Sequence, residues 1–263
     1  MRYAFVEDDC HEAAPGLAGT CRVCGGAAIA KCGQHRIWHW AHKGTRTCDT
    51  WWEPETQWHR GWKDHFPKGW QETIHAAPNG EKHIADVKTE SGVALEFQHS
   101  FLPEAERQGR EQFYSKMIWI VDGQRRKRDR AQFFASFDNA IHQQPLVIPA
   151  RLHDSALLRD WKASRVPVYF DFGDSEPSDL CRFSEPTLWR LNPNSQSGAV
   201  FLSPVAKSYL IEVYRTGVAF DEPFTETLQL VADLLRKRQE FRHRMPSAFD
   251  WQLMRRQRAR RRF

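Results

Sequence analysis

Apolar residues in the first half of the chain recur with two spacings, which predict helices and strands in turn. Trp58, Trp62 and Phe66 are four residues apart, the spacing of one helix face, and Pro54 suits a first helical turn. Short apolar segments with turn residues between them follow, as strands require. The predicted order is helix, three strands, helix, strand, over residues 51–66, 70–76, 82–88, 93–98, 103–116 and 117–121.

The pattern beyond Gly123 predicts further elements but indicates no chemistry of its own. We expect this half to extend the sheet and to pack beside the first half. Its predicted helices and strands cover residues 156–163, 166–173, 188–191, 199–202, 205–216 and 224–242.

Residues 84–100 carry the most informative chemistry, because they predict a hairpin with a glycine-containing turn at residues 90–92. Side chains two apart on a strand share a face, so Glu96 and Gln98 point the same way. A hairpin that returns Glu96 beside Asp86 brings two carboxylates together. Such a pair is costly unless it is protonated or neutralised, and Mg²⁺ is the usual partner of oxygen ligands.

The first predicted helix also has a polar face, formed by Glu55, His59 and Lys63 at intervals of four. One interpretation is a solvated ladder of opposite charges. The other is support for an acidic site, because the three predicted strands follow directly. Lys88 lies two residues after Asp86 and therefore on the same strand face.

Cys21 and Cys24 have the spacing of a zinc knuckle, in a segment that holds four of the six cysteines. The N-terminus lacks the apolar region of a secretion signal, so we expect reduced cysteines and a cytoplasmic protein. Reduced cysteines without a metal are the alternative to structural zinc. Candidates for the second ligand pair are Cys32, His35, His39, His42 and Cys48.

The positive charge of the chain is concentrated at its C-terminal end. Eleven Lys or Arg and two Asp or Glu lie from Arg236 to Phe263, whereas the whole chain has a net charge of +5. The remainder is therefore slightly acidic, and the tail is the part expected to attract polyanions without sequence preference. A solubilising terminus is the alternative. No apolar run has the length of a membrane span.

The spacing Asp-x9-Glu-x-Gln in a strand-turn-strand context resembles the PD-(D/E)xK nuclease motif, with Gln98 at the usual lysine. The wider pattern resembles the competence protein CoiA family over roughly the first half of the chain. The ordered motifs that carry this likeness are Cys21-x2-Cys24, His39-Trp40-Ala41-His42, Cys48, Glu55-x3-His59-x3-Lys63, Ile84-Ala85-Asp86-Val87, Leu95-Glu96-Phe97-Gln98-His99-Ser100, Arg110-x3-Tyr114 and Trp119-Ile120-Val121-Asp122-Gly123.

This resemblance implies a restriction-endonuclease-like αβββαβ core within a mixed α/β (α+β) fold. It also implies a metal-dependent DNA endonuclease that acts in DNA uptake, recombination or foreign-DNA processing. Mg²⁺ or Mn²⁺ would be held by Asp86, Glu96 and the backbone carbonyl of Phe97, with help from Glu55. Gln98 would orient a water molecule but cannot supply positive charge. The charge would come from one of two further residues, Lys88 or His59.

For the zinc site, the resemblance implies His42 and Cys48 as partners of Cys21 and Cys24, with His39 in reserve. Four protein ligands would make the zinc structural.

DNA is the partner that the resemblance implies, together with recombination or defence proteins. Arg107, Arg110 and Tyr114 fall on one helix face and are candidates for phosphate contacts. A basic run, Arg125, Arg126, Lys127 and Arg128, is a second candidate. Both sets have the alternative of ordinary solvated charges.

We therefore expect four parts. They are a zinc-binding segment (1–50), a nuclease-like core (51–130), an α/β extension (131–240) and a basic tail (241–263). The alternative function is a non-catalytic DNA-binding or recombination-accessory module with the same fold.

Overall fold

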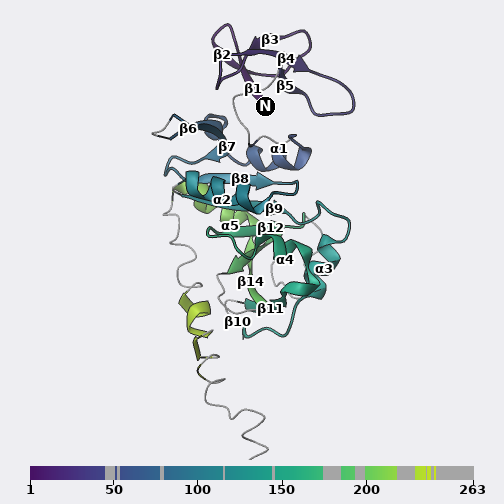
Figure 1. Cartoon of the computed structure of the whole chain (residues 1–263), viewed down its shortest axis with the longest axis vertical. Coiled ribbons are helices and arrows are strands. Elements are labelled where there is room, and N and C mark those ends of the chain that lie inside the picture. Colours follow the sequence, from purple (N-terminus) through teal and green to yellow (C-terminus); the bar gives the residue numbers. More distant parts are fainter. Residues whose placement is uncertain are drawn as a thin grey trace, which may run out of the picture. The chain divides into compact units, whose positions relative to one another are not determined.

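The structure is a computed structural model of the 263-residue chain, and its described residues form two β-sheets with helices (Figure 1). It describes residues 1–44, 51, 54–77, 80–114, 116–143, 146–173, 185–192, 199–217, 229–234, 236–237 and 240. Within these ranges, no helix is long and apolar enough to cross a membrane.

The first sheet is antiparallel and has five strands in the order β2-β1-β3-β4-β5. Its small core is formed by Ala4, Ala28 and Trp40 together with Cys21. The strands are β1 (Tyr3–Val6), β2 (Asp9–Glu12), β3 (Ala18–Thr20), β4 (Ala27–Lys31) and β5 (His39–His42).

The second sheet has nine strands in the order β10-β11-β14-β13-β12-β9-β8-β7-β6. Strands β8, β9 and β12 run parallel, and their other neighbours are antiparallel. Its first elements are α1 (Gln57–Asp64), a 3₁₀ turn (Lys68–Trp70), β6 (Gln71–Ala76), β7 (Lys82–Lys88), β8 (Ala94–Gln98), α2 (Glu104–Phe113) and β9 (Met117–Asp122).

The second half of the chain continues this same sheet, as the sequence predicted. Its elements are α3 (Asp129–Ala135), β10 (His142–Gln143), β11 (Leu146–Arg151), a 3₁₀ turn (Leu152–Asp154), α4 (Ala156–Trp161), β12 (Val168–Asp171), β13 (Thr187–Asn192), β14 (Ala199–Ala206) and α5 (Lys207–Thr216). Strands β10 and β11 and helix α3 were not predicted. The helix predicted over 224–242 lies mostly outside the described residues.

Helix α1 begins later than the proline at position 54 suggested. Thr56 is the N-cap, and its side chain accepts a hydrogen bond from the backbone of His59. The His59 ring bonds back to the Thr56 backbone, which completes a capping box. This reciprocal pair caps the first turn, which begins at Gln57.

The two faces of β8 hold different helices, because successive side chains on a strand point to opposite sides. On one face, Phe97 stacks with Trp62 of α1 at a ring-centroid distance of 5.6 Å. On the other face, Glu96 contacts Arg110 of α2. Helices α1 and α2 therefore cover opposite faces of β8, and the acidic hairpin lies between them.

Candidate functional site: a cysteine-histidine group and a buried carboxylate cluster

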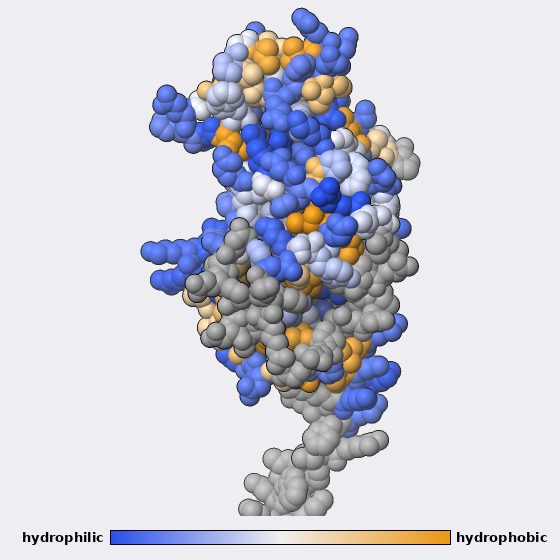
Figure 2. All heavy atoms as spheres, turned by 180° about the vertical axis from the view of Figure 1, so that it is seen from behind, coloured by the Kyte–Doolittle hydropathy of each residue, from blue (hydrophilic) through white to orange (hydrophobic). Residues whose placement is uncertain are grey.

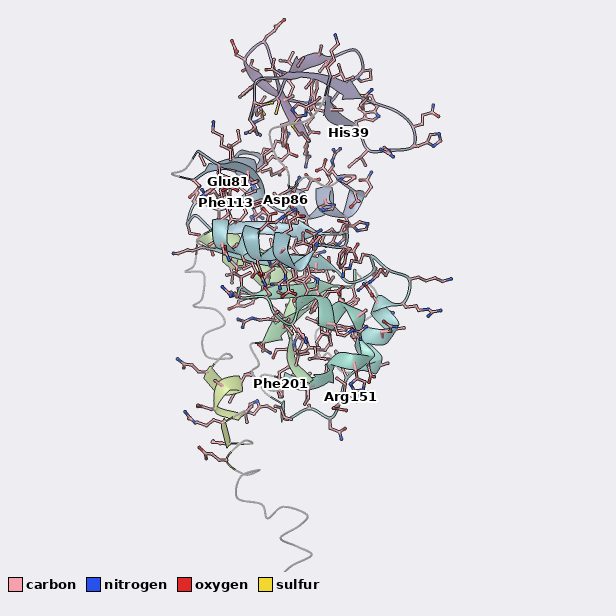
Figure 3. The ribbon with its side chains drawn as sticks, in the orientation of Figure 1. His39, Glu81, Asp86, Phe113, Arg151 and Phe201 are labelled. Atoms are coloured by element: carbon pink, nitrogen blue, oxygen red, sulfur yellow. The ribbon has the colours of Figure 1, made fainter. Side chains whose placement is uncertain are left out.

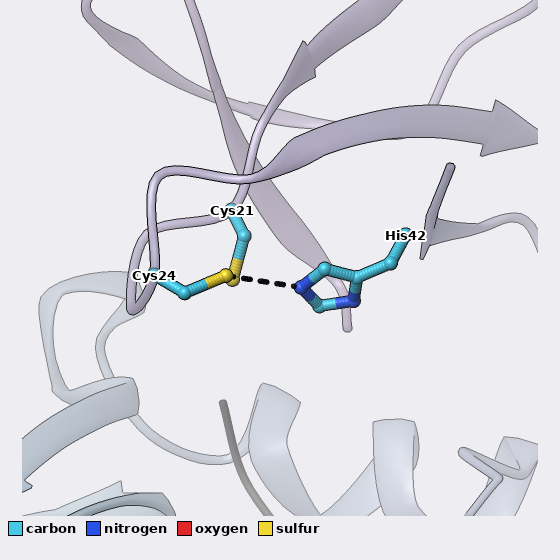
Figure 4. Close-up of side chains that lie close together, drawn as sticks. All are labelled: Cys21, Cys24 and His42. Carbon is cyan, nitrogen blue, oxygen red and sulfur yellow. Dashed lines mark hydrogen bonds between the residues drawn. The ribbon is translucent and has the colours of Figure 1, made fainter. Parts of the chain in front are cut away.

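Cys21, Cys24 and His42 form a group that can hold a metal ion such as zinc (Figure 4). One ligand atom from each residue lies within 4.8 Å of the others. Cys24 Sγ is 3.4 Å from His42 Nε2. Two sulfurs and one imidazole nitrogen are ligands that zinc prefers. Three of the four predicted ligands are thus together, and Cys48 lies outside the described residues.

The turn after Cys21 orients both sulfurs toward the same point. The backbone N–H groups of Val23 and Gly26 donate to Cys21 Sγ and Cys24 Sγ, each at 3.4 Å. Gly25 has a φ of 68°, a conformation that favours glycine. Donated N–H bonds stabilise the thiolate form, which is the form that binds a metal.

His39, the reserve ligand, does not belong to this group. It lies on β5 an odd number of positions before His42, so the two side chains leave the strand on opposite faces. Its Nδ1 atom is 2.9 Å from the backbone oxygen of Ile37. Cys32 and His35 are also outside the group.

The Asp86 carboxylate lies between β7 and β8, labelled in Figure 3. Its Oδ2 atom accepts a hydrogen bond of 3.0 Å from the backbone N–H of Phe97. The regular pairing of the two strands ends at Val87 and Leu95, so this side-chain bond takes the place of the next ladder bond. The other oxygen, Oδ1, lies 3.1 Å from Lys63 Nζ.

Lys63 is the centre of an acidic cluster contributed by a helix, the chain before it and two strands. Its ammonium lies 3.2 Å from Glu55, 3.3 Å from Glu72 and 3.1 Å from Asp86. The lysine side chain is only 4% exposed. Burial alone would lower the pKa of Lys63, but Asp86, Glu72 and Glu55 raise it above its ordinary value. Lys63 is therefore charged in the cluster.

Glu72 was not identified from the sequence, although it belongs to the acidic cluster around Lys63. It sits opposite Asp86, since its neighbours Gln71 and Thr73 pair with Val87 and Ala85. Burial would raise the pKa of Glu72, but Lys63 and two backbone N–H bonds lower it to about 2. The one sequence signal for Glu72 was its place on the predicted strand 70–76, next to the strand that carries Asp86.

Glu55, predicted to support a metal, instead bonds to two cations of α1. Its oxygens lie 3.2 Å from Lys63 and 2.9 Å from Arg60. Burial would raise the pKa of Glu55, but the Lys63 ammonium, helped by Arg60, holds it below its ordinary value. Glu55 is thus an ionised partner of Lys63.

Glu96 comes directly after the last regular pair, Val87 with Leu95, and therefore lies across from Asp86. It is buried and is held by Arg110 at 3.3 Å. Arg110 also contacts Glu106 at 2.5 Å and donates to the backbone oxygen of Trp51 at 2.6 Å. Burial would lower the pKa of Arg110, but Glu96 and Glu106 raise it. Each of the two predicted metal-binding carboxylates therefore has a helical cation beside it.

The remaining candidate residues of the core are placed by their own contacts. Gln98 is buried and its amide donates to the backbone oxygen and hydroxyl of Ser100, both at 3.2 Å. Lys88 contacts His75 at 2.8 Å and is not among the partners of Asp86. His59 is buried in the capping box of α1. The cation beside Asp86 is thus Lys63, where the sequence suggested Lys88 or His59.

A histidine-carboxylate pair that the sequence analysis did not single out lies just beyond Gln98. His99 Nδ1 is 2.7 Å from Asp122 Oδ2, and the His99 side chain is partly exposed. The His59 and His99 rings are 6.0 Å apart. His99 follows β8 and Asp122 is the last residue of β9, and the carboxyl ends of these two parallel neighbouring strands meet at one edge.

Most predicted phosphate contacts lie on buried or paired side chains. Arg110 and Tyr114 are buried, and so is Arg107, which bonds to Glu111 at 2.8 Å. This burial argues against a direct contact with DNA through these three residues. The reason is that their helix face packs on the sheet, whereas the sequence pattern does not distinguish a packed polar face from a solvated one.

The basic run is partly neutralised. Arg125 and Arg126 both contact Asp160, at 2.7 and 3.0 Å. Lys127 and Arg128 are exposed and remain available to a phosphate backbone.

Comparison of the chain with protein-family models, curated proteins and solved structures finds no match.

Proposed function

We propose that the protein is a metal-dependent nuclease that hydrolyses phosphodiester bonds in DNA. One observation carries this proposal: Asp86 and Glu96, on neighbouring strands, each have a buried cation from a flanking helix beside them. The order α1, β6, β7, β8, α2, β9 supports a restriction-endonuclease-like core, in which such strands hold the acidic motif.

In the PD-(D/E)xK motif a lysine supplies positive charge at the position that Gln98 occupies in this chain. We assign that role to Lys63. Its ammonium is the positive charge closest to Asp86 among the described ion pairs. A fixed cation there stabilises charge that develops on a phosphate in the transition state. Gln98 is held by Ser100, so its amide has a defined orientation toward a water molecule.

The donor set fits a hard divalent cation, because it consists of carboxylate oxygens and a backbone carbonyl. Asp86, Glu96 and the carbonyl of Phe97 are the residues that would hold Mg²⁺ or Mn²⁺. The ion would supply Lewis-acid polarisation of the scissile phosphate. Lys63 and Arg110 lie beside the two carboxylates, at 3.1 and 3.3 Å.

Cleavage of single- and double-stranded DNA in Mg²⁺, Mn²⁺ or EDTA tests the proposal. Asp86→Asn, Glu96→Gln and Lys63→Met should each abolish metal-dependent cleavage. Glu90→Gln is the matched control, because Glu90 is exposed at the hairpin turn. Cleavage that persists unchanged in Asp86→Asn and Glu96→Gln would falsify the assignment of the two carboxylates.

A non-catalytic DNA-binding module is the second candidate, and the same ion pairs favour it. Carboxylates that already have side-chain cations as partners need no metal to offset their burial. This function predicts DNA binding that is equal in Mg²⁺ and EDTA, with intact DNA under every condition.

A further inference from the structure

A cavity of about 400 Å³ lies beside the carboxylate cluster. Its lining includes His35 and Arg36 from the loop between β4 and β5 (residues 32–38), His39 from β5, and Glu55 and Thr56 just before α1. None of the first three residues was a candidate for contacting nucleic acid in the sequence analysis. Figure 3 labels His39 on the N-terminal sheet and Asp86 in the larger one.

The cavity is tied to the proposed catalytic cluster by one arginine. Arg60 donates to the backbone oxygen of Trp38 at 2.8 Å and to Glu55 at 2.9 Å. Glu55 contacts Lys63, which contacts Asp86. The loop that carries the basic residues is therefore held in a fixed position relative to the cluster.

The loop combines basic and aromatic side chains. His35 and Arg36 are exposed, and neither forms an ion pair with another residue in the described ranges. Trp38 is 45% exposed, between two residues that line the cavity. The molecular face in Figure 2 is mostly hydrophilic, with apolar side chains scattered over it. An indole at the surface beside unneutralised basic groups is the combination that binds unpaired nucleotides.

We infer that a single strand of DNA enters the proposed nuclease site through this cavity. A backbone phosphate lies against Arg36 and the two histidines, and an unpaired base stacks on Trp38. This inference rests on the proposed function and names its substrate class. A single strand fits better than a duplex because its bases are free to stack and its backbone is narrow enough for a cavity of this size.

Fluorescence anisotropy with a fluorescein-labelled oligo-dT tests the inference in EDTA, where cleavage does not interfere. Trp38→Ala should weaken binding about tenfold, the usual size of one lost stacking contact. Arg36→Gln should weaken binding and reduce the salt slope by about one. Tyr209→Ala and Arg165→Gln are the matched controls, because both residues are exposed and lie outside the cavity lining.

Circular dichroism should show that all four variants fold, since the altered side chains are exposed. Unchanged affinity in both Trp38→Ala and Arg36→Gln overturns the inference. An equal loss of affinity for a blunt duplex also overturns it, because the loop would then bind duplex backbone. If Trp38→Ala and Arg36→Gln weaken oligo-dT binding but the wild type cuts no DNA, the strand-binding site is supported and the nuclease proposal is rejected.

Discussion

At the scale of single residues, Lys63 determines the character of the cluster. Three carboxylates approach one buried ammonium. Burial disfavours the charged forms of Glu55 and Glu72, and Lys63 offsets that cost. In the proposed activity, the same side chain also acts on a phosphate. Stability and the proposed activity therefore depend on one residue.

Lys63→Met should lower the free energy of unfolding by about 3 kcal/mol, because it leaves buried carboxylates without their partner. Urea denaturation at pH 7 measures the change. Lys162→Met is the control, as Lys162 is exposed. An unchanged denaturation midpoint for Lys63→Met would contradict the central role of the ammonium.

The stability of the protein should fall as pH drops through the range in which Glu72 titrates. Its folded pKa of about 2 lies below the ordinary value of 4.5. The stabilisation is therefore present above 4.5 and is lost as pH falls toward 2. Glu72→Gln should flatten this part of the curve of unfolding free energy against pH. A wild-type slope retained in that variant would assign it to other groups.

At the scale of elements, helix α1 is held in place by residues more than a hundred positions later in the chain. The indole N–H groups of Trp58 and Trp62 donate to Asp171 Oδ2 at 3.0 and 2.7 Å. Lys207 of α5 lies over the Trp62 ring at 4.6 Å. The helix that presents Lys63 is thus held by strands and helices of the second half.

Asp171→Ala should lower the free energy of unfolding by about 3 kcal/mol, since two hydrogen bonds to a buried carboxylate are lost. It should also reduce cleavage, because Lys63 is carried on the displaced helix. Chemical denaturation and a cleavage assay measure these effects, with Glu90→Ala as the control. Full stability together with full activity would show that the two indole bonds do not position α1.

The N-terminal sheet should depend on its metal. Purified protein is expected to contain about one zinc per chain, and Cys21→Ser or Cys24→Ser should remove it and lower the melting temperature. Metal analysis and thermal denaturation measure both effects. Cys10→Ser is the control, because Cys10 is exposed and outside the ligand group. A metal-free wild type of equal stability would favour reduced cysteines alone.

The order of elements in the core followed from the sequence because spacing determines local structure. Trp62 and Phe66 are buried as the four-residue repeat predicted, and β7 and β8 occupy the predicted hairpin. The partners of Asp86 could not be predicted from the sequence. Lys63 and Glu72 reach it through the packing of a helix and the pairing of strands, and such contacts between distant segments leave no periodic signal.

At the scale of the whole molecule, charge is divided between a nearly neutral fold and a basic end. Removing residues 241–263 should weaken non-specific DNA binding and reduce its salt dependence, while metal-dependent cleavage of short substrates is retained. Binding isotherms at several salt concentrations measure the effect, and a variant with the tail arginines changed to lysines is the control. Equal salt slopes with and without residues 241–263 would exclude an electrostatic role for them.

The bond between Trp62 and Asp171 joins residues 109 positions apart. During translation, α1 and its lysine emerge from the ribosome long before the strand that fixes them. Helix α1 therefore lacks its hydrogen bonds to Asp171 until β12 has been synthesised. If the proposed nuclease activity depends on the position of Lys63, we expect a nascent chain to gain it only after the second half has folded against the first.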